Sequence, residues 1–469
     1  MSDQDTPRNN EGNQPDDELR RMLEQLLGGG MINPDQLAGV AGLPADPQAL
    51  SQMLMQLQQA MRNPTEGINW QVVRDAARQT AAENREVSAE EEKEYEQAFG
   101  LAQLWLTEVT TVGSTVLPEQ PRAITRYEWL NLSHDTWAEI SGPVAESISR
   151  ALVDMINEQA PEEYKSMINQ SLPMVRSIGQ AMFGMQLGQV LGQLAKEVLS
   201  GGDIGMPVLE HGKAALLPQN LSSWSEGLEI KPSEILLYFA VRELAHAHLY
   251  MHARWLRLHL VNAVTEFARG IRIDTEQIED TVRGMDVSNP EELKKVLQSG
   301  QLIPPRTPEQ EIALERLETM LALIDGWVDV VTQDATSRLP NADAIAEMVR
   351  RRRATGNPAE KAFGSLVGLE LRPRRLREAT SMWRLVTEKL GADARDALWD
   401  HRDALPTGQD ISDPFALVER LSGSSENVIT DELDDELARL LGDPDSFGEA
   451  PQGGEDQGDA GSGHEKPRG

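Results

Sequence analysis

The stretch Lys231–Gly270, KPSEILLYFAVRELAHAHLYMHARWLRLHLVNAVTEFARG, holds four of the eight histidines of this 469-residue chain. Its apolar residues recur at the three- and four-residue spacing of an α-helix, with a proline near its start and a glycine at its end. On a helical wheel, Arg242, Glu243 and His246 fall on the same side as the large apolar residues. We predict one helix over this stretch, with the polar triplet on its buried face.

The buried triplet needs partners, because an isolated charge inside a protein costs several kcal/mol. One arrangement is a structural network, in which Arg242 neutralises Glu243 and His246 bonds to a neighbouring carbonyl. In the other arrangement, the triplet belongs to a metal site. The spacing of the residues leaves both arrangements open.

A second polar set lies near the opposite side of the same helix and consists of His248, His252, His259 and Trp255. His248 and His252 have the four-residue spacing at which two imidazoles can chelate zinc. No carboxylate lies one turn away among them to act as a base. Partly exposed histidines beside an aromatic ring are therefore the simpler interpretation, and this pair is a rival metal site.

The rest of the chain's middle carries further segments with helical periodicity and few alternating strand patterns. Glycine and proline turn signals separate these segments. We therefore predict a mainly α fold, with one large helical domain over residues 67–421. The other predicted helices are Trp70–Ala82, Ala89–Val109, Trp137–Ile156, Pro161–Leu199, Pro308–Ala335, Asn341–Arg353 and Arg375–Leu390.

One predicted helix carries a stripe of glycines, because Gly184, Gly188 and Gly192 recur every four residues. Glycine weakens an isolated helix, so packing has to offset its cost. The stripe predicts that another helix packs closely against this one.

The two ends of the chain differ from its middle. Residues 1–17 are polar and acidic and are predicted to be disordered, and residues 18–66 are predicted to form a small helical region. Residues 422–469 are predicted to form an acidic, mostly disordered tail. Within this tail, residues 431–441 place four leucines on one face, which predicts a short helix.

Composition excludes several classes of site and partner. The chain has no cysteine, which rules out disulfides, thiolate metal sites and cysteine nucleophiles, so a metal would need His, Asp or Glu. Its net charge of −32 disfavours nucleic acid and anionic membrane surfaces as partners. The N-terminus lacks signal-peptide features and no stretch reads as a transmembrane span, so we expect a cytoplasmic protein. The sequence predicts no particular oligomeric state.

Four short segments resemble the zincin-like metallopeptidase family of uncharacterised bacterial zinc hydrolases. Intact members read HExxH where this chain has RELAH at 242–246, and a segment close to VPWL where it has ARWL at 253–256. LALIDGWVDV at 321–330 is similar to the family's LLEGHAEHV segment, and LVGLELRPRRLRE at 366–378 also looks typical of the family. The similarity runs from Trp70 to Asp413 and implies a zincin-like fold.

Carried over residue by residue, the resemblance makes His246 a zinc ligand and Asp325 a carboxylate ligand. Glu243 becomes the general base that deprotonates a metal-bound water. Arg242 stands where HExxH has its first histidine, and a guanidinium has no lone pair to donate to a metal.

The second ligand segment departs from the family as well. Trp327 and Val330 stand where the family shows histidines. Both halves of the family's metal site are therefore altered in this chain.

Three functions follow, and they differ in class. The first, which we take as the prediction, is a zinc-dependent metallopeptidase or other hydrolase with a degenerate motif, whose metal uses His246, Asp325 and another residue. The alternative is a metal-free zincin-like pseudo-enzyme, in which Arg242 replaces the cation by pairing with Glu243 and Asp325 and which acts as a protein-interaction module. Either function implies a peptide or protein as substrate or partner.

The third function is an interaction protein that binds through its charged segments. Two arginine clusters stand out in this acidic chain, and a solvated helix face is their usual explanation. Without interleaved aromatic residues, no nucleic acid is expected on them. The acidic segment 431–441 is a candidate intramolecular partner for this basic surface. The clusters are Arg350–Arg353 and the group Arg372, Arg374, Arg375 and Arg377.

Overall fold

The fold was determined as a computed structural model. It describes residues 67–159, 165–209, 212–271, 306–356, 358–369, 371 and 373–426, with side chains for all of these except 151–179 and 424–426. The predictions for residues 1–17, 18–66 and 431–441, and for most of the acidic tail, lie outside the described residues.

The chain divides into two units, Met1–Pro414 and Phe415–Gly469. Helix α20 (Pro414–Glu426) starts at the boundary and belongs almost entirely to the second unit. All other described elements lie in the first unit.

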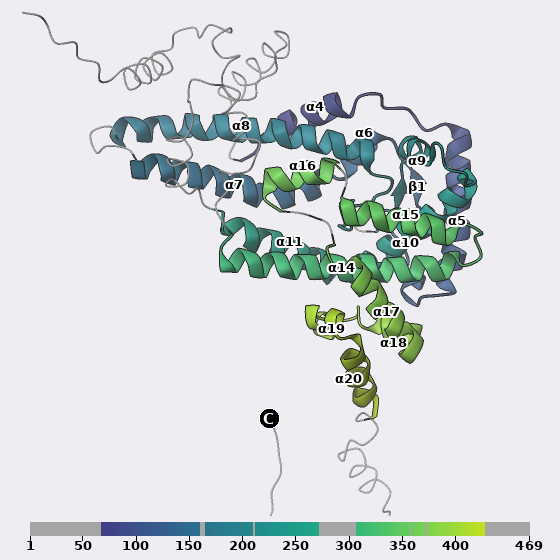
Figure 1. Cartoon of the computed structure of the whole chain (residues 1–469). Coiled ribbons are helices and arrows are strands. Elements are labelled where there is room, and N and C mark those ends of the chain that lie inside the picture. Colours follow the sequence, from purple (N-terminus) through teal and green to yellow (C-terminus); the bar gives the residue numbers. More distant parts are fainter. Residues whose placement is uncertain are drawn as a thin grey trace, which may run out of the picture. The chain divides into compact units, whose positions relative to one another are not determined.

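The described part of the chain is almost entirely helical, which confirms the predicted mainly α fold (Figure 1). Its two strands, β1 (Arg122–Ala123) and β2 (Ala215–Leu216), pair in parallel, with Arg122 opposite Ala215. None of the described helices is long and apolar enough to cross a membrane. The α-helices of the first unit are α4 Trp70–Ala81, α5 Ala89–Thr107, α6 Arg126–Leu132, α7 His134–Gln159, α8 Lys165–Glu197, α9 Pro218–Ser225, α10 Pro232–His252, α11 Trp255–Arg269, α14 Pro308–Thr336, α15 Ala342–Thr355, α16 Pro358–Val367, α17 Leu376–Leu390, α18 Ala392–Ala397 and α19 Gly408–Ser412, and the 3₁₀ turns are η1 Val112–Ser114 and η2 Arg402–Ala404.

Local sequence explains where the main helices begin. Ser88 and Glu91 form a capping box at the start of α5, in which each side chain bonds to the other residue's backbone N–H. Thr307 and Gln310 do the same for α14. Proline occupies the first turn of both α10 and α14, where its missing N–H costs no helical hydrogen bond.

The glycine stripe packs as predicted. A Cβ atom at Gly188 would lie 2.5 Å from the carbonyl oxygen of Val73, and one at Gly192 would lie 2.5 Å from that of Ala77. Both carbonyls belong to α4, which therefore approaches the α8 backbone more closely than any side chain would allow. The stripe is thus a helix-packing surface.

The prediction of one helix over residues 232–270 was wrong. The stretch forms two helices, α10 and α11, which are separated at Ala253, where φ is −94° and ψ is 66°. No glycine or proline lies at the break, so neither turn signals nor helical periodicity could predict it. A tertiary contact lies at this corner, where the Trp255 indole N–H donates to the carbonyl of Trp399 at 3.3 Å.

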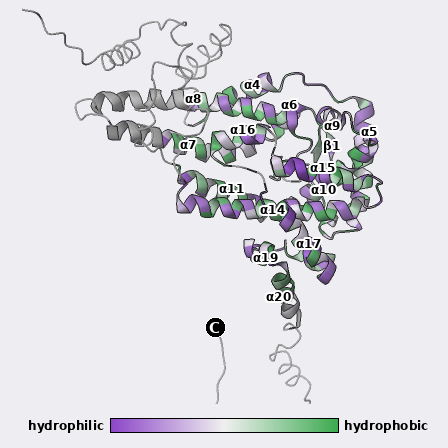
Figure 2. Cartoon of the chain, viewed as in Figure 1, coloured by the Kyte–Doolittle hydropathy of each residue, from purple (hydrophilic) through white to green (hydrophobic). Residues whose placement is uncertain are grey.

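Helix α10 is buried on every side rather than on one face. Every residue from Glu234 to Met251 is buried, because α5, α14 and α15 all contact this helix. Figure 2 shows the strongly hydrophilic α15 close to α10. Polar groups that a wheel assigns to an exposed face therefore need internal partners.

Candidate functional site

The polar triplet of α10 is buried as the helical wheel predicted. The exposed fraction is 4% for Arg242, 1% for Glu243 and 2% for His246. Asp325 of α14, which the family resemblance selected, is 0% exposed and lies beside them. The structure thus brings all four of these residues together.

Arg242 turns toward Asp325 and not toward Glu243. Its Nη2 donates to Asp325 Oδ1 at 2.9 Å, and both side chains are buried. The prediction that Arg242 pairs with both Glu243 and Asp325 therefore agrees with this geometry for Asp325 and not for Glu243. No hydrogen bond or ion pair joins Arg242 to Glu243 among the described contacts.

A second arginine holds the other oxygen of Asp325. Arg353 of α15 donates to Asp325 Oδ2 from Nη2 at 2.7 Å and from Nε at 3.3 Å. Burial by itself would raise the pKa of Asp325, but Arg353, His246 and Arg242 together hold that pKa well below its usual range. The carboxylate is therefore ionised between two guanidinium groups.

Arg353 links further parts of the fold and is 2% exposed at its side chain. It donates to Glu360 Oε1 at 2.8 Å and to the carbonyl of Ile204 at 2.8 Å. Sequence analysis missed this residue because it read the arginine run as a solvated face. A signal was available, since four successive residues of a helix, each turned about 100° from the last, cover most of its circumference.

The interpretation of Arg350–Arg353 as a solvated face needs correction. Arg352 donates to both oxygens of the buried Asp203 at 2.7 Å, and Arg350 donates to the buried Asp329 at 3.0 Å. Only Arg351 is largely exposed. Three of these four charges are therefore satisfied inside the fold, which leaves little basic surface for a partner.

Glu243 binds backbone rather than another side chain of the triplet. Its Oε2 accepts from the N–H of Gly202 at 2.8 Å, and its Oε1 accepts from the N–H of Ala215 at 2.9 Å. Burial raises the pKa of Glu243, although these two amides and nearby His246 oppose the rise. Glu243 thus fastens the loop after α8 and strand β2 to α10.

His246 has one ring nitrogen bonded and one free. Its Nδ1 donates to the carbonyl of Arg242 at 3.1 Å, as the structural arrangement predicted. Its Nε2 lies 3.5 Å from Asp325 Oδ1 and makes no hydrogen bond to the described residues. Only this nitrogen could offer a lone pair to a ligand.

A glycine-rich loop lies directly on the site. A Cβ atom at Gly202 would lie 2.7 Å from His246 Cγ, and one at Gly205, where φ is +78°, would lie 2.9 Å from Asp325 Oδ2. The Tyr250 hydroxyl donates to the Gly205 carbonyl at 2.6 Å and holds the loop there. These glycines, which look like turn signals in the sequence, let the backbone cover the triplet.

Little space remains next to Glu243 and His246. The cavity there measures about 20 Å³, which is on the order of one water molecule. A peptide bond with its flanking residues has no room in it. The side of α10 that carries the family's motif is therefore closed.

The residues present do not fit a zinc ion. Zinc needs three or four lone-pair donors, and no group of three or more His, Asp or Glu side chains suited to a metal occurs in the part of the chain that the structure describes. Arg242 and Arg353 occupy both oxygens of Asp325, so of the two ligands that the resemblance selects, only His246 keeps a nitrogen, Nε2, without a hydrogen bond to the described residues.

The rival pair does not share a ligand position. His248 Nε2 bonds to Gln103 Oε1 at 2.7 Å, whereas His252 Nε2 bonds to Asp400 Oδ1 at 2.8 Å. His248 is 2% exposed, which corrects our expectation of a partly exposed ring, and His252 is exposed. The two imidazoles thus belong to different local networks.

The second altered segment is also built into the core. The Trp327 indole N–H donates to Asp396 Oδ1 at 3.0 Å, and Val330 is 1% exposed. Asp329, one turn after Asp325, was missed by sequence analysis. Burial raises the pKa of Asp329, and its Oδ1 lacks a hydrogen bond among the described residues.

Comparisons with known proteins agree with this fold. The crystal structure described as "a putative hydrolase with a novel fold", from Chloroflexus aurantiacus, matches with a TM-score of 0.53 and 18% identity, covering 76% of this chain and 99% of that one. None of the curated proteins matches this chain. The family model for zincin-like metallopeptidases matches residues 68–418, close to the range in which the sequence resembles that family. The chain therefore belongs to the zincin-like metallopeptidase family.

Proposed function

We propose that this protein is a metal-free zincin-like pseudo-enzyme that acts as a protein-interaction module and binds peptide segments. The observation that carries the proposal is the buried ion pair between Arg242 Nη2 and Asp325 Oδ1 at 2.9 Å. The guanidinium provides the positive charge that a zinc ion would otherwise provide next to this carboxylate. Membership of a peptidase family favours a peptide as the ligand.

The cost of breaking a buried ion pair supports a lasting contact between Arg242 and Asp325. Removing one partner of a buried ion pair leaves an uncompensated charge and costs about 3–5 kcal/mol. For a zinc ion to use Asp325, both Arg242 and Arg353 would have to release it and remain buried without this carboxylate. Two protein ligands, His246 and Asp325, offer a zinc ion too few bonds to offset that cost.

Glu243 also has a structural role, because it binds backbone amides. A general base needs an oxygen that can reach the attacking water, and both oxygens of Glu243 already accept backbone N–H groups. We therefore assign Glu243 to holding the loop that closes the site.

A zinc-dependent hydrolase is the second candidate. It is favoured by family membership and by the free Nε2 of His246, 3.5 Å from Asp325. Elemental mass spectrometry of the purified, untagged protein separates the two candidates. The proposal expects far less than one zinc per chain and no cleavage of casein. About one zinc per chain, lost in both His246→Ala and Asp325→Ala, would establish the second candidate instead.

The variant Arg242→His serves as the matched control, because it restores HExxH and frees one oxygen of Asp325. We expect this variant to bind more zinc than the natural chain does. Zinc bound equally by both chains would contradict the idea that Arg242 replaces the metal.

A further inference from the structure

A space much larger than the cavity beside Glu243 lies on the opposite side of α10 from the polar triplet. It is a groove of about 640 Å³ between α5, the segment 113–121 and α10, to which α10 contributes Leu244 and His248. Volumes of 300–1,000 Å³ are typical of sites that bind small ligands. The groove is therefore large enough for a short piece of polypeptide.

The buried ring of His248 lies at one end of this groove. Gln103 Nε2 donates to the carbonyl of Gly113 at 2.8 Å, and Gln103 Oε1 is 2.7 Å from His248 Nε2. The other ring nitrogen, Nδ1, is buried, and the backbone of Thr115 lies near the ring. The ring is thus fixed in place as a wall of the groove.

The ring stays neutral at physiological pH. Burial lowers the pKa of His248 to about 4, although the backbone of Thr115 opposes this shift. The end of the groove next to His248 therefore carries no charge.

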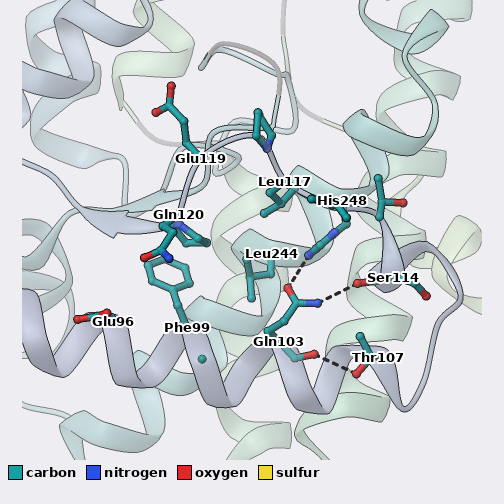
Figure 3. Close-up of a pocket in the computed structure, with 16 residues that line it drawn as sticks. Glu96, Phe99, Gln103, Thr107, Ser114, Leu117, Glu119, Gln120, Leu244 and His248 are labelled. Atoms are coloured by element: carbon teal, nitrogen blue, oxygen red, sulfur yellow. Dashed lines mark hydrogen bonds between the residues drawn. The ribbon is translucent and has the colours of Figure 1, made fainter.

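The rest of the groove has an apolar middle and an acidic end (Figure 3). Phe99, Leu117 and Leu244 lie in its middle, while Glu96 and Glu119 lie at the end away from His248. Glu119 is paired with Lys213 at 3.3 Å, but no lysine or arginine is among the residues that line the groove. Charge complementarity thus favours a cation at the acidic end.

We propose that this groove binds a short polypeptide segment that carries a lysine or arginine next to an apolar residue. The basic side chain lies near Glu96 and Glu119, and the apolar residue packs on Phe99 and Leu244. This inference rests on the proposed function, for which it names the binding site and the partner's chemistry.

Fluorescence anisotropy with three pools of labelled pentapeptides tests the inference. In every pool one position is leucine, its neighbour is lysine, glutamate or alanine, and the other positions are randomised. We expect the lysine pool to bind at least about tenfold more tightly than the glutamate pool. Spermidine, which has charge but no apolar side chain, should not compete. Equal binding of the three pools, or displacement by spermidine, would overturn the inference.

Because the whole chain carries a net charge of −32, any basic peptide is attracted to it in part non-specifically. Charge reversal at two sites of α5 separates this effect from the groove. Glu96→Lys should weaken binding by about tenfold, whereas Glu94→Lys, on the other side of the same helix, should change it by less than about twofold. Equal losses in both variants would mean that only the overall charge attracts the peptide.

A nuclear magnetic resonance experiment with ¹⁵N-labelled histidine tests the location of binding in the natural chain. Binding of the lysine pool should shift the ring-nitrogen signals of His248, because this ring lines one end of the groove, and these signals are assigned by their absence in His248→Phe. Binding without a shift would place the peptide outside the groove. Zinc in the protein or cleavage of the peptides would overturn the proposed function alone. Zinc-free protein that binds the three pools equally would overturn this inference alone.

Discussion

The two sides of α10 differ in how they use buried polar groups. On the side that carries the altered HExxH motif, Arg242 and Glu243 are tied to Asp325 and to backbone amides, and a cavity of about 20 Å³ remains. On the opposite side, the neutral, buried ring of His248 lines a groove of about 640 Å³. In this chain the family's motif therefore lies on the closed side of α10. The groove lies on the side that carries no family motif.

The largest expected effect concerns the ion-pair network of the closed side. Arg353→Ala should lower the free energy of unfolding by about 3–5 kcal/mol, because it leaves Asp325 and Glu360 buried with one cation fewer. Urea denaturation measures this loss. The matched control is Arg351→Ala, whose side chain is 73% exposed and should matter little. Similar losses in both variants would show that the buried network contributes no special stability.

The second prediction tests how tightly the loop covers the closed side. Gly202→Ala places a methyl group 2.7 Å from the His246 ring and should destabilise the fold by about 1–3 kcal/mol. Gly142→Ala in α7 meets no atom within 4 Å and should instead stabilise the helix by about 0.5–1 kcal/mol. Thermal unfolding shows whether Gly202→Ala lowers the melting temperature and Gly142→Ala raises it. A neutral result at Gly202 would mean that the loop does not close over the site.

The third prediction concerns the open side and is the smallest per step, because it is a slope of stability with pH. The pKa of His248 falls from 6.5 in the unfolded chain to about 4 in the fold, so the unfolded chain binds a proton more readily. Stability should therefore decrease as the pH falls from 6.5 toward 4, by at most about 1.4 kcal/mol per pH unit. Denaturation at several pH values should show a shallower slope for His248→Gln than for the natural chain. Identical slopes would place the ring of His248 in contact with water.

Much of the fold could be predicted from the sequence. Apolar periodicity and capping residues located α4, α5, α14 and α17 to within two residues at most ends. The glycines of α8 predicted a close helix contact because nothing else offsets their cost in a helix. The motif segments identified the family, and the family model covers nearly the same range.

The candidate site was only partly predictable. The helical wheel placed Arg242, Glu243 and His246 on a buried face, and the resemblance selected Asp325, 83 residues from Arg242 in the sequence. Neither argument found Arg353, because the run of four arginines was interpreted as a charged surface, although four successive residues of a helix cannot all face solvent. Neither could show that Glu243 binds backbone amides, since amides carry no sequence signature.

The sequence by itself therefore determined the helices, the buried polar triplet and the family, because these depend on local periodicity and on residue types. Only the tertiary structure decided the break at Ala253, the two arginines on Asp325, and which side of α10 is open. The physical reason is that burial and pairing are properties of contacts between distant segments. Because α10 is packed on all sides, its own sequence cannot show which of its faces lies beside a groove.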